Sequence, residues 1–107
     1  MGTVVRTLDK LQSLERLYRQ GFHSEVIDRA IDKLLAGEIE RAHTERRDLE
    51  ARLADYEKRY HMSSEEFYRR FRAGELGDGM DFVEWSVFYE MHQAILERLK
   101  VLGAIPQ

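Results

Sequence analysis

Two near-identical stretches decide how this chain folds: Met62-Ser63-Ser64-Glu65-Glu66-Phe67 and Met80-Asp81-Phe82-Val83-Glu84-Trp85. In each stretch, a residue that caps helices is followed three positions later by Glu, which is the pattern of a capping box. In each, a Met precedes the cap and an aromatic residue follows four positions after it, so that the two side chains can pack as a hydrophobic staple. The stretches therefore predict two short-linked helices whose entry angles are fixed.

The aromatic side chains are concentrated around these two helix starts. Nine of the eleven lie between Tyr56 and Tyr89, and residues 75–107 carry six acidic against two basic side chains. We expect a surface that binds a basic partner protein, because aromatic side chains dominate interface energies and an anionic rim attracts cations. The alternative is that most of the aromatic side chains, Phe67 and Trp85 above all, form the core of the domain. The predicted partner-binding residues are Glu75, Asp78, Phe82, Glu84, Phe88 and Tyr89.

The composition is that of a small helical protein. The 107 residues suffice for one ordinary domain or two very small ones, and the single proline, Pro106, permits helix through the body of the chain. The absence of Cys excludes disulfides and thiol chemistry and fits a reducing compartment. No apolar run approaches the roughly 18 residues of a membrane span, and the N-terminus lacks the apolar segment of a signal peptide. We therefore expect a cytoplasmic protein without membrane contact.

Residues 1–37 are predicted to form a dimerisation module. It serves either dimerisation alone or dimerisation together with DNA binding. Thr3-Val4-Val5-Arg6-Thr7 is rich in β-branched residues and forms either a short strand or the start of a helix. Apolar residues then follow helical spacing over residues 8–19, Gly21 interrupts the pattern, and Ser24 is placed to cap a second helix.

Residues 38–61 are predicted to form a heptad-patterned helix. The two seam series are Ile39, Arg46, Leu53 and Tyr60, and Leu35, Ala42, Leu49 and Tyr56. About three heptads of this kind predict either a helical hairpin or a coiled-coil dimer. Gly37 either ends the preceding helix or only weakens it, at a cost of about 1 kcal/mol relative to Ala.

Residues 62–107 are predicted to form an aromatic, acidic unit of two helices. The first spans residues 64–73 and is closed by Gly74, and the second spans residues 82–102 and is ended by Gly103. The fold class is therefore mainly α: a helical hairpin or long central helix, with or without a short N-terminal strand, and a C-terminal two-helix unit. The apolar stripe of the last helix is Trp85, Phe88, Tyr89, His92, Ile95, Leu96, Leu99 and Leu102.

No motif predicts catalysis, a cofactor or a metal. The four His residues are scattered without a partner at ligand spacing, and the acidic residues around the loop at 75–84 do not match a calcium-binding loop. Arg16 and His23 have the loose spacing of the Arg–His pairs of some helical RNA-cleaving toxins, but Gly21 interrupts the helix between them. We expect a protein without enzyme activity, cofactor or metal.

The N-terminal third resembles a ribbon-helix-helix DNA-binding module over residues 3–36. The resemblance rests on Phe22-His23-Ser24-Glu25-Val26-Ile27-Asp28-Arg29-Ala30, because such modules often open their second helix with a Ser-Glu-Val-Ile-type sequence. It implies that a homodimer places a two-stranded ribbon in the major groove of an operator, with Arg6 and Thr7 toward the bases and Ser24 at a phosphate. The strand departs from the pattern, because it lacks clean apolar and polar alternation and Arg6 alone could make a strong base contact. A plain helical hairpin that serves dimerisation is the alternative.

The C-terminal part resembles small bacterial and archaeal proteins associated with toxin–antitoxin gene pairs. The stretches that carry the resemblance are Tyr60-His61-Met62-Ser63-Ser64-Glu65-Glu66-Phe67-Tyr68, Gly74-Glu75-Leu76-Gly77-Asp78 and Asp81-Phe82-Val83-Glu84-Trp85. It implies an antitoxin-like homodimer or higher homo-oligomer that neutralises a small basic toxin and represses its own operon. The alternative function is that of a helical homo-oligomeric adaptor or structural protein without DNA binding.

Overall fold

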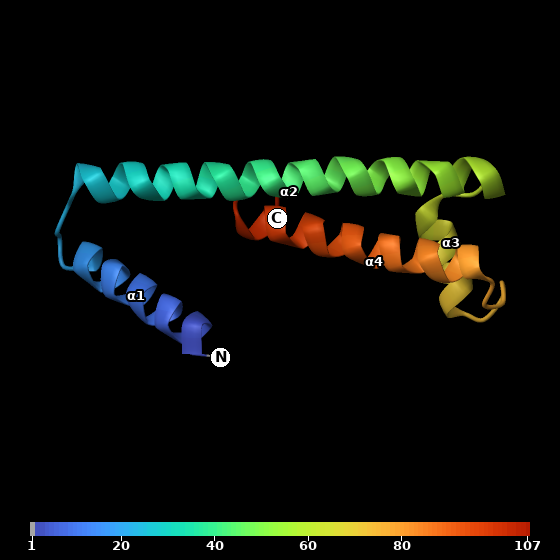
Figure 1. Ribbon diagram of the computed structural model, residues 1–107, viewed down its shortest axis with the longest axis horizontal. Helices are drawn as coiled ribbons and strands as arrows, with labels where there is room; N and C mark the ends of the chain where they lie inside the picture. The colour runs from blue at the N-terminus through green and yellow to red at the C-terminus, as the bar shows by residue number, and fades with distance from the viewer. Residues whose placement is uncertain (1) are drawn as a thin grey trace. The chain divides into compact units, whose positions relative to one another are not determined.

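The computed structural model describes residues 2–107, which form four helices (Figure 1). They are α1 (Gly2–Arg19), α2 (Glu25–Tyr60), α3 (Ser64–Arg72) and α4 (Met80–Val101). The mainly α fold class is confirmed. No strand occurs among the described residues, and residues 3–7 belong to the first turns of α1. The chain divides into two compact units, one up to Lys33 and one from Leu34 to Gln107.

The N-terminal unit is held together at the turn between its two helices. α1 ends before Gly21, which takes a φ of 95°, a left-handed conformation that residues with a Cβ atom avoid. Ser24 caps α2 as predicted, since its Oγ accepts the backbone N–H of Ile27 at 3.3 Å. Across the turn, the Tyr18 hydroxyl donates to Asp28 Oδ1 at 2.7 Å. The two helices are therefore pinned at the end where the chain reverses.

α2 is continuous through Gly37, so the helix that starts after Ser24 and the heptad-patterned helix are one element of 36 residues. From Ala42 onward its apolar seam is covered by α4 of the same chain, which is the hairpin alternative of the heptad prediction. The buried seam residues of α2 are Ala42, Leu49, Leu53 and Tyr56.

α4 returns antiparallel along the second half of α2 (Figure 1). The ring of His92 lies 3.0 Å from the carboxylate of Glu50, and Arg98 lies 3.8 Å from Glu45. The later residue of α4 thus pairs with the earlier residue of α2, so the two helices run antiparallel. The apolar core between the two helices consists of Ala42, Leu49, Ile95 and Leu99.

A second core, almost wholly aromatic, lies where α3 packs against α2 and α4. Phe67 of α3 and Trp85 of α4 are completely buried, so the interpretation of these two residues as core is confirmed. Tyr56 and Tyr60 of α2 both stack on Trp85, with ring centroids 5.5 and 5.8 Å away. Stacked aromatic pairs contribute about 0.5–1.5 kcal/mol beyond the area that they bury. This aromatic core fixes α3 and the first half of α4 on α2.

The start of α3 contains the serine cap and the staple of the first predicted motif, whereas the carboxylate of Glu66 binds Arg69 and does not complete the capping box. Ser63 Oγ accepts the backbone N–H of Glu66 at 3.1 Å, and Met62 packs against the aromatic core that contains Phe67. The helix closes at Gly74, which takes the predicted left-handed conformation with a φ of 78°. The local sequence therefore determines both ends of this short helix.

The second predicted capping motif is not formed. α4 begins at Met80 instead of Phe82, and its N-cap is Gly79, which makes no side-chain capping bond. Asp81 consequently lies inside the first turn, and Met80 is 73% exposed, so the predicted staple to Trp85 is wrong. The physical reason is competition for the Asp81 carboxylate, because two side chains at the end of α2 bind it.

Candidate functional site

The structure places the six residues predicted to bind a partner in two settings. Four lie on α4 and two in the preceding loop. The four on α4 make contacts within the fold, and one of the two loop residues forms an ion pair. Their role in binding a partner stays a prediction. Because most of them already contact other residues of the chain, they leave less surface for a partner than six free side chains would.

Two carboxylates at the start of α4 bind tyrosines of α2. Glu84 Oε2 accepts the hydroxyl of Tyr56 at 2.8 Å, and Asp81 Oδ2 accepts the hydroxyl of Tyr60 at 2.5 Å and the guanidinium of Arg59 at 2.8 Å. Burial together with the Glu84 carboxylate raises the pKa of Tyr56 to about 12. The hydrogen bond from Tyr60, followed by that from Arg59, lowers the pKa of Asp81. Both carboxylates therefore hold α4 against α2.

Three aromatic side chains of α4 are half-buried against neighbouring rings. Phe82 packs on Tyr60 with ring centroids 5.1 Å apart, and Tyr89 stacks on Tyr68 at 4.6 Å. A guanidinium of α2 lies over the ring of Phe88, 5.1 Å from its centroid. These rings are mainly part of the fold, and all three stay partly exposed.

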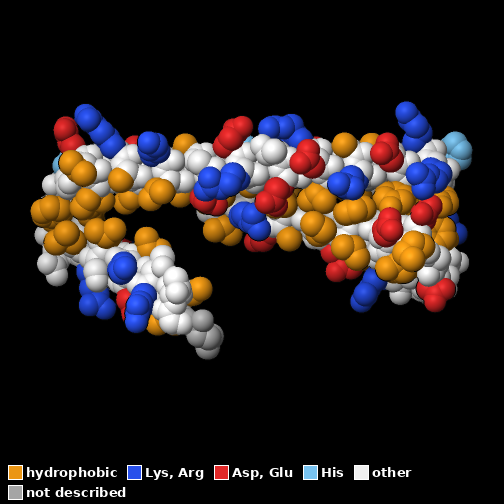
Figure 2. Space-filling view, viewed as in Figure 1, with side chains coloured by type: hydrophobic (Ala, Val, Ile, Leu, Met, Phe, Trp, Pro, Cys, Tyr) orange, Lys and Arg blue, Asp and Glu red, His pale blue; other side chains and the backbone are white. Residues whose placement is uncertain are grey.

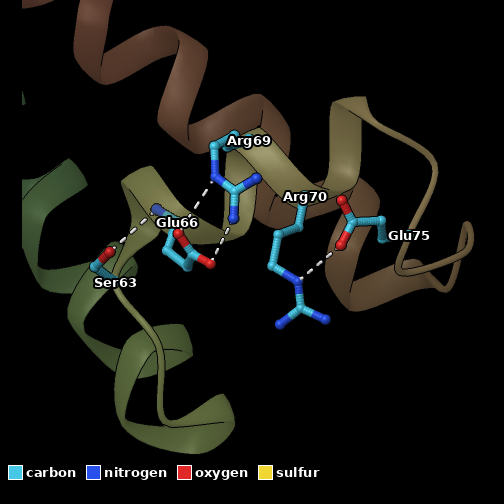
Figure 3. Close-up of polar contacts among 5 residues, drawn as sticks. All are labelled: Ser63, Glu66, Arg69, Arg70 and Glu75. Carbon is cyan, nitrogen blue, oxygen red and sulfur yellow. Dashed lines mark hydrogen bonds and ion pairs between the residues drawn. The ribbon is translucent and has the colours of Figure 1, made fainter.

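The polar contacts of α3 and the following loop take up most of the charge there (Figure 3). Glu66 Oε1 accepts from Arg69 at 2.7 Å, which lowers the pKa of Glu66, and Glu75 accepts from Arg70 at 3.4 Å. Asp78 is exposed and makes no hydrogen bond or ion pair with any residue that the structure describes. Of the two acidic loop residues, Asp78 is thus the one with an open carboxylate.

α4 carries a second apolar stripe that the sequence reasoning missed. Met80, Val83, Val87 and Met91 recur at steps of three or four residues, and they are between 42% and 73% exposed. We call these four residues the outer stripe of α4. The spacing of three and four residues could have indicated this second apolar face from the sequence. It was passed over because the core stripe of the same helix already explained why the helix is amphipathic.

The outer stripe borders a shallow groove between α2 and α4. Met91 belongs to both, and Figure 2 shows apolar side chains gathered between the two helices on the visible face. Leu49 and Phe88 supply further apolar surface, and charged side chains of α2 stand beside them. The residues that line the groove are Glu45, Asp48, Leu49, Arg52, Phe88 and Met91. A fixed helix with an exposed apolar edge and an adjoining groove has the form of a protein-binding surface.

Of the three residues predicted to contact DNA, two lie on a helix and the third directly precedes one. Arg6 and Thr7 belong to α1, where the Thr7 hydroxyl donates to the carbonyl oxygen of Thr3 at 3.0 Å. Ser24 caps α2, as the resemblance to a ribbon-helix-helix module requires. The ribbon itself is not formed within residues 2–107. DNA binding stays a prediction, and in this geometry it would use helix surfaces.

One histidine in each unit pairs with a carboxylate. His23 Nε2 lies 2.8 Å from Asp28, and His92 Nε2 lies 3.0 Å from Glu50. In the part of the chain that the structure describes, no three His, Asp or Glu side chains are grouped so as to hold a metal ion. None of the described helices is both long enough and apolar enough to cross a membrane.

Comparison with protein-family models, with curated proteins and with solved structures finds no match. The class of protein is therefore defined by its own architecture. It is an all-α chain in which a three-helix unit with a complete core presents an apolar stripe outward on its last helix.

Proposed function

We propose that this chain is an antitoxin-like binding protein that holds a small basic partner protein on the outer stripe of α4 and neutralises it. The observation that carries the proposal is the exposure of Met80, Val83, Val87 and Met91 on a helix that is held in the fold by other residues. The buried residues of that helix are Trp85, Ser86, Ile95 and Leu99. Contiguous apolar surface that the core does not need is typical of interaction sites.

The surface is fixed before a partner arrives, which favours binding. α4 is anchored to α2 by the aromatic core around Trp85 and by the hydrogen bond from Tyr56 to Glu84. A preorganised helix loses little conformational entropy when it is bound, so more of the contact energy remains as affinity. Met80 and Met91 can adapt their flexible side chains to the shape of the partner.

The charge of the C-terminal third supports a basic partner. Residues 75–107 carry six acidic against two basic side chains. Asp78 in the loop and Glu97 on α4 are both exposed. Anionic groups around an apolar stripe accelerate encounter with a cationic protein and disfavour acidic ones.

The adaptor alternative is favoured by a different observation. The N-terminal unit exposes large apolar side chains along α1, none of which is buried. A homo-oligomeric adaptor would use this surface for assembly without any DNA contact.

Repression of the operon by Arg6, Thr7 and Ser24 is a separate proposal, which a mobility-shift assay on the promoter of the gene tests. Loss of the shift in Arg6→Ala supports it, and the absence of any sequence preference contradicts it.

Co-expression with the product of the adjacent gene tests neutralisation. We expect the two proteins to copurify and the growth defect caused by the neighbour to be relieved. The double variant Val87→Glu with Met91→Glu should weaken binding by at least about 30-fold, because it places charges in the centre of the stripe. Gln93→Glu is the matched control, since Gln93 is exposed on α4 and lies outside the stripe. A harmless neighbour, or equal binding by both variants, contradicts the proposal.

A further inference from the structure

The N-terminal unit lacks a core of its own. α1 has 18 residues and none of them is buried. Isolated helices of this length are marginal in water, and most helical stability in proteins comes from packing an amphipathic face. Ten of the fifteen exposed large apolar side chains in residues 2–107 lie in this part of the chain and just beyond it. They are Val4, Val5, Leu8, Leu11, Leu17, Phe22, Val26, Ile31, Leu34 and Leu35.

The exposed apolar side chains form stripes instead of scattered points. On α1, Val4, Leu8 and Leu11 recur at steps of four and three residues, and they are 64%, 54% and 55% exposed. On the part of α2 that belongs to the same unit, Val26 and Ile31 are 79% and 38% exposed, and Ala30 between them is exposed as well. A helical hairpin with an uncovered stripe on each helix is half of a helix bundle.

The turn keeps the two stripes in a defined relation. The Tyr18 hydroxyl, which donates to Asp28, also lies 3.0 Å from the carbonyl oxygen of Ser24, and His23 lies 2.8 Å from the same Asp28 carboxylate. Figure 2 shows the apolar side chains that gather around this turn. The hairpin is thus closed at one end by polar contacts, while its apolar surface stays open.

We infer that a second copy of this chain covers these stripes, and that two N-terminal hairpins pair about a two-fold axis into a four-helix unit. A second copy is the occupant that necessarily carries a matching apolar surface, because an isologous interface uses the same patch on both subunits. A standard interface covers about 800 Å² on each partner, and Val4, Leu8 and Leu11 of α1 with Val26 and Ile31 of α2 would form the apolar centre of such a patch.

Charge favours a second copy over the basic partner proposed for α4. Residues 2–33 carry six Lys or Arg against five Asp or Glu, so two such units meet with little net repulsion. A strongly basic protein would gain nothing from this balance, whereas the C-terminal third would attract it. The pairing does not depend on the function proposed for α4, and it uses a different surface.

The oligomeric state of the full chain in solution tests the inference. We expect sedimentation equilibrium to give twice the 12.7 kDa mass of one chain. Leu11→Glu should raise the dissociation constant of the dimer by at least about 30-fold, since it places a charge in the stripe. Ser13→Glu adds the same charge on the other side of α1 and should leave the dimer intact. Ile31→Glu should act like Leu11→Glu from the second helix.

Two further measurements distinguish loss of the dimer from unfolding and from an effect of the other apolar surface. Fluorescence of Trp85, the single Trp, should be unchanged in Leu11→Glu, which shows that the C-terminal unit remains folded. Val87→Glu should stay dimeric, because the outer stripe of α4 is not the pairing surface. A monomer at every accessible concentration overturns the inference. So does a dimer that survives both Leu11→Glu and Ile31→Glu, or one that only Val87→Glu dissociates.

Discussion

The indole ring of Trp85 lies flat on the phenyl ring of Phe67, with ring centroids 3.8 Å apart and 3° between the ring planes. Both side chains are completely buried, and the indole N–H donates to Ser64 Oγ at 2.9 Å. One contact therefore joins α3 to α4 by stacking and by a buried hydrogen bond. The stability of the C-terminal unit should depend on it more than on any surface ion pair, since exposed pairs contribute about 0–1 kcal/mol.

Ser64→Ala should lower the free energy of unfolding of the C-terminal unit by about 1–3 kcal/mol, because it leaves the buried indole N–H without an acceptor. Denaturant unfolding followed by Trp85 fluorescence measures this change. Ser86→Ala is the matched control: Ser86 is also buried, but its hydroxyl donates to the carbonyl of Val83 in its own helix. Equal losses in the two variants would show that the bond to Trp85 has no special weight.

Asp81→Asn should change the response of stability to acid. The pKa of Asp81 is lowered in the folded state by Tyr60 and then by Arg59. Its contribution is therefore complete above the ordinary aspartate pKa of about 3.9, and it is lost as the pH falls below that value. Thermal unfolding in this acidic range should show a shallower pH dependence for Asp81→Asn than for Asp78→Asn, since Asp78 has no partner within residues 2–107. The same slope in both variants contradicts the role assigned to Asp81.

Tyr56 should be a late tyrosine to ionise when the protein is titrated with base. Burial and Glu84 raise its pKa to about 12, compared with about 10 for a free tyrosine. Its contribution to stability is thus complete below about pH 10 and is lost as the pH rises through the raised value. Phenolate absorbance and ring-carbon NMR measure the pKa. Glu84→Gln should lower it, because the neighbouring charge disappears, whereas Glu90→Gln should affect Tyr68 instead.

His61→Gly should stabilise the protein by about 1 kcal/mol. His61 directly follows the end of α2 and has a φ of 54°, which is in the left-handed region. This conformation costs a residue with a Cβ atom about 1–2 kcal/mol of conformational free energy and costs Gly little. Ala54→Gly provides the opposite case, since Ala54 is exposed within α2 and the change should cost about 1 kcal/mol. Calorimetry of the two variants measures both effects, and destabilisation by His61→Gly would contradict the conformational argument.

Local chemistry predicted the features that depend on neighbours in sequence. The Ser24 and Ser63 caps, the glycine closure at Gly74 and the core stripe of α4 follow from capping, backbone sterics and helical spacing, and the structure contains them. The heptad pattern of α2 predicted an apolar seam, but the same pattern suits a hairpin and a dimer. Only the placement of α4 decides between them for residues 42–60.

The start of α4 could not be predicted from its own residues. Asp81 has the chemistry of a cap, but Tyr60 and Arg59 bind its carboxylate from more than twenty positions away in sequence. Glu84 is likewise bound by Tyr56 across the helix pair. A partner at such a distance depends on the fold, so a prediction from local pattern assigned both carboxylates to a capping box, and Glu84 also to a binding rim. Exposure of the outer stripe depends on the fold in the same way.

The chain consists of a C-terminal unit with its own core and an N-terminal hairpin whose apolar side chains we expect a second copy to cover. Amide hydrogen exchange measured over a range of protein concentrations tests this division most directly. We predict that protection of α1 and the first turns of α2 rises with concentration, while protection around Leu53, Trp85 and Leu99 stays constant. Strong protection of α1 at the lowest concentration, or equal concentration dependence in both regions, would contradict it.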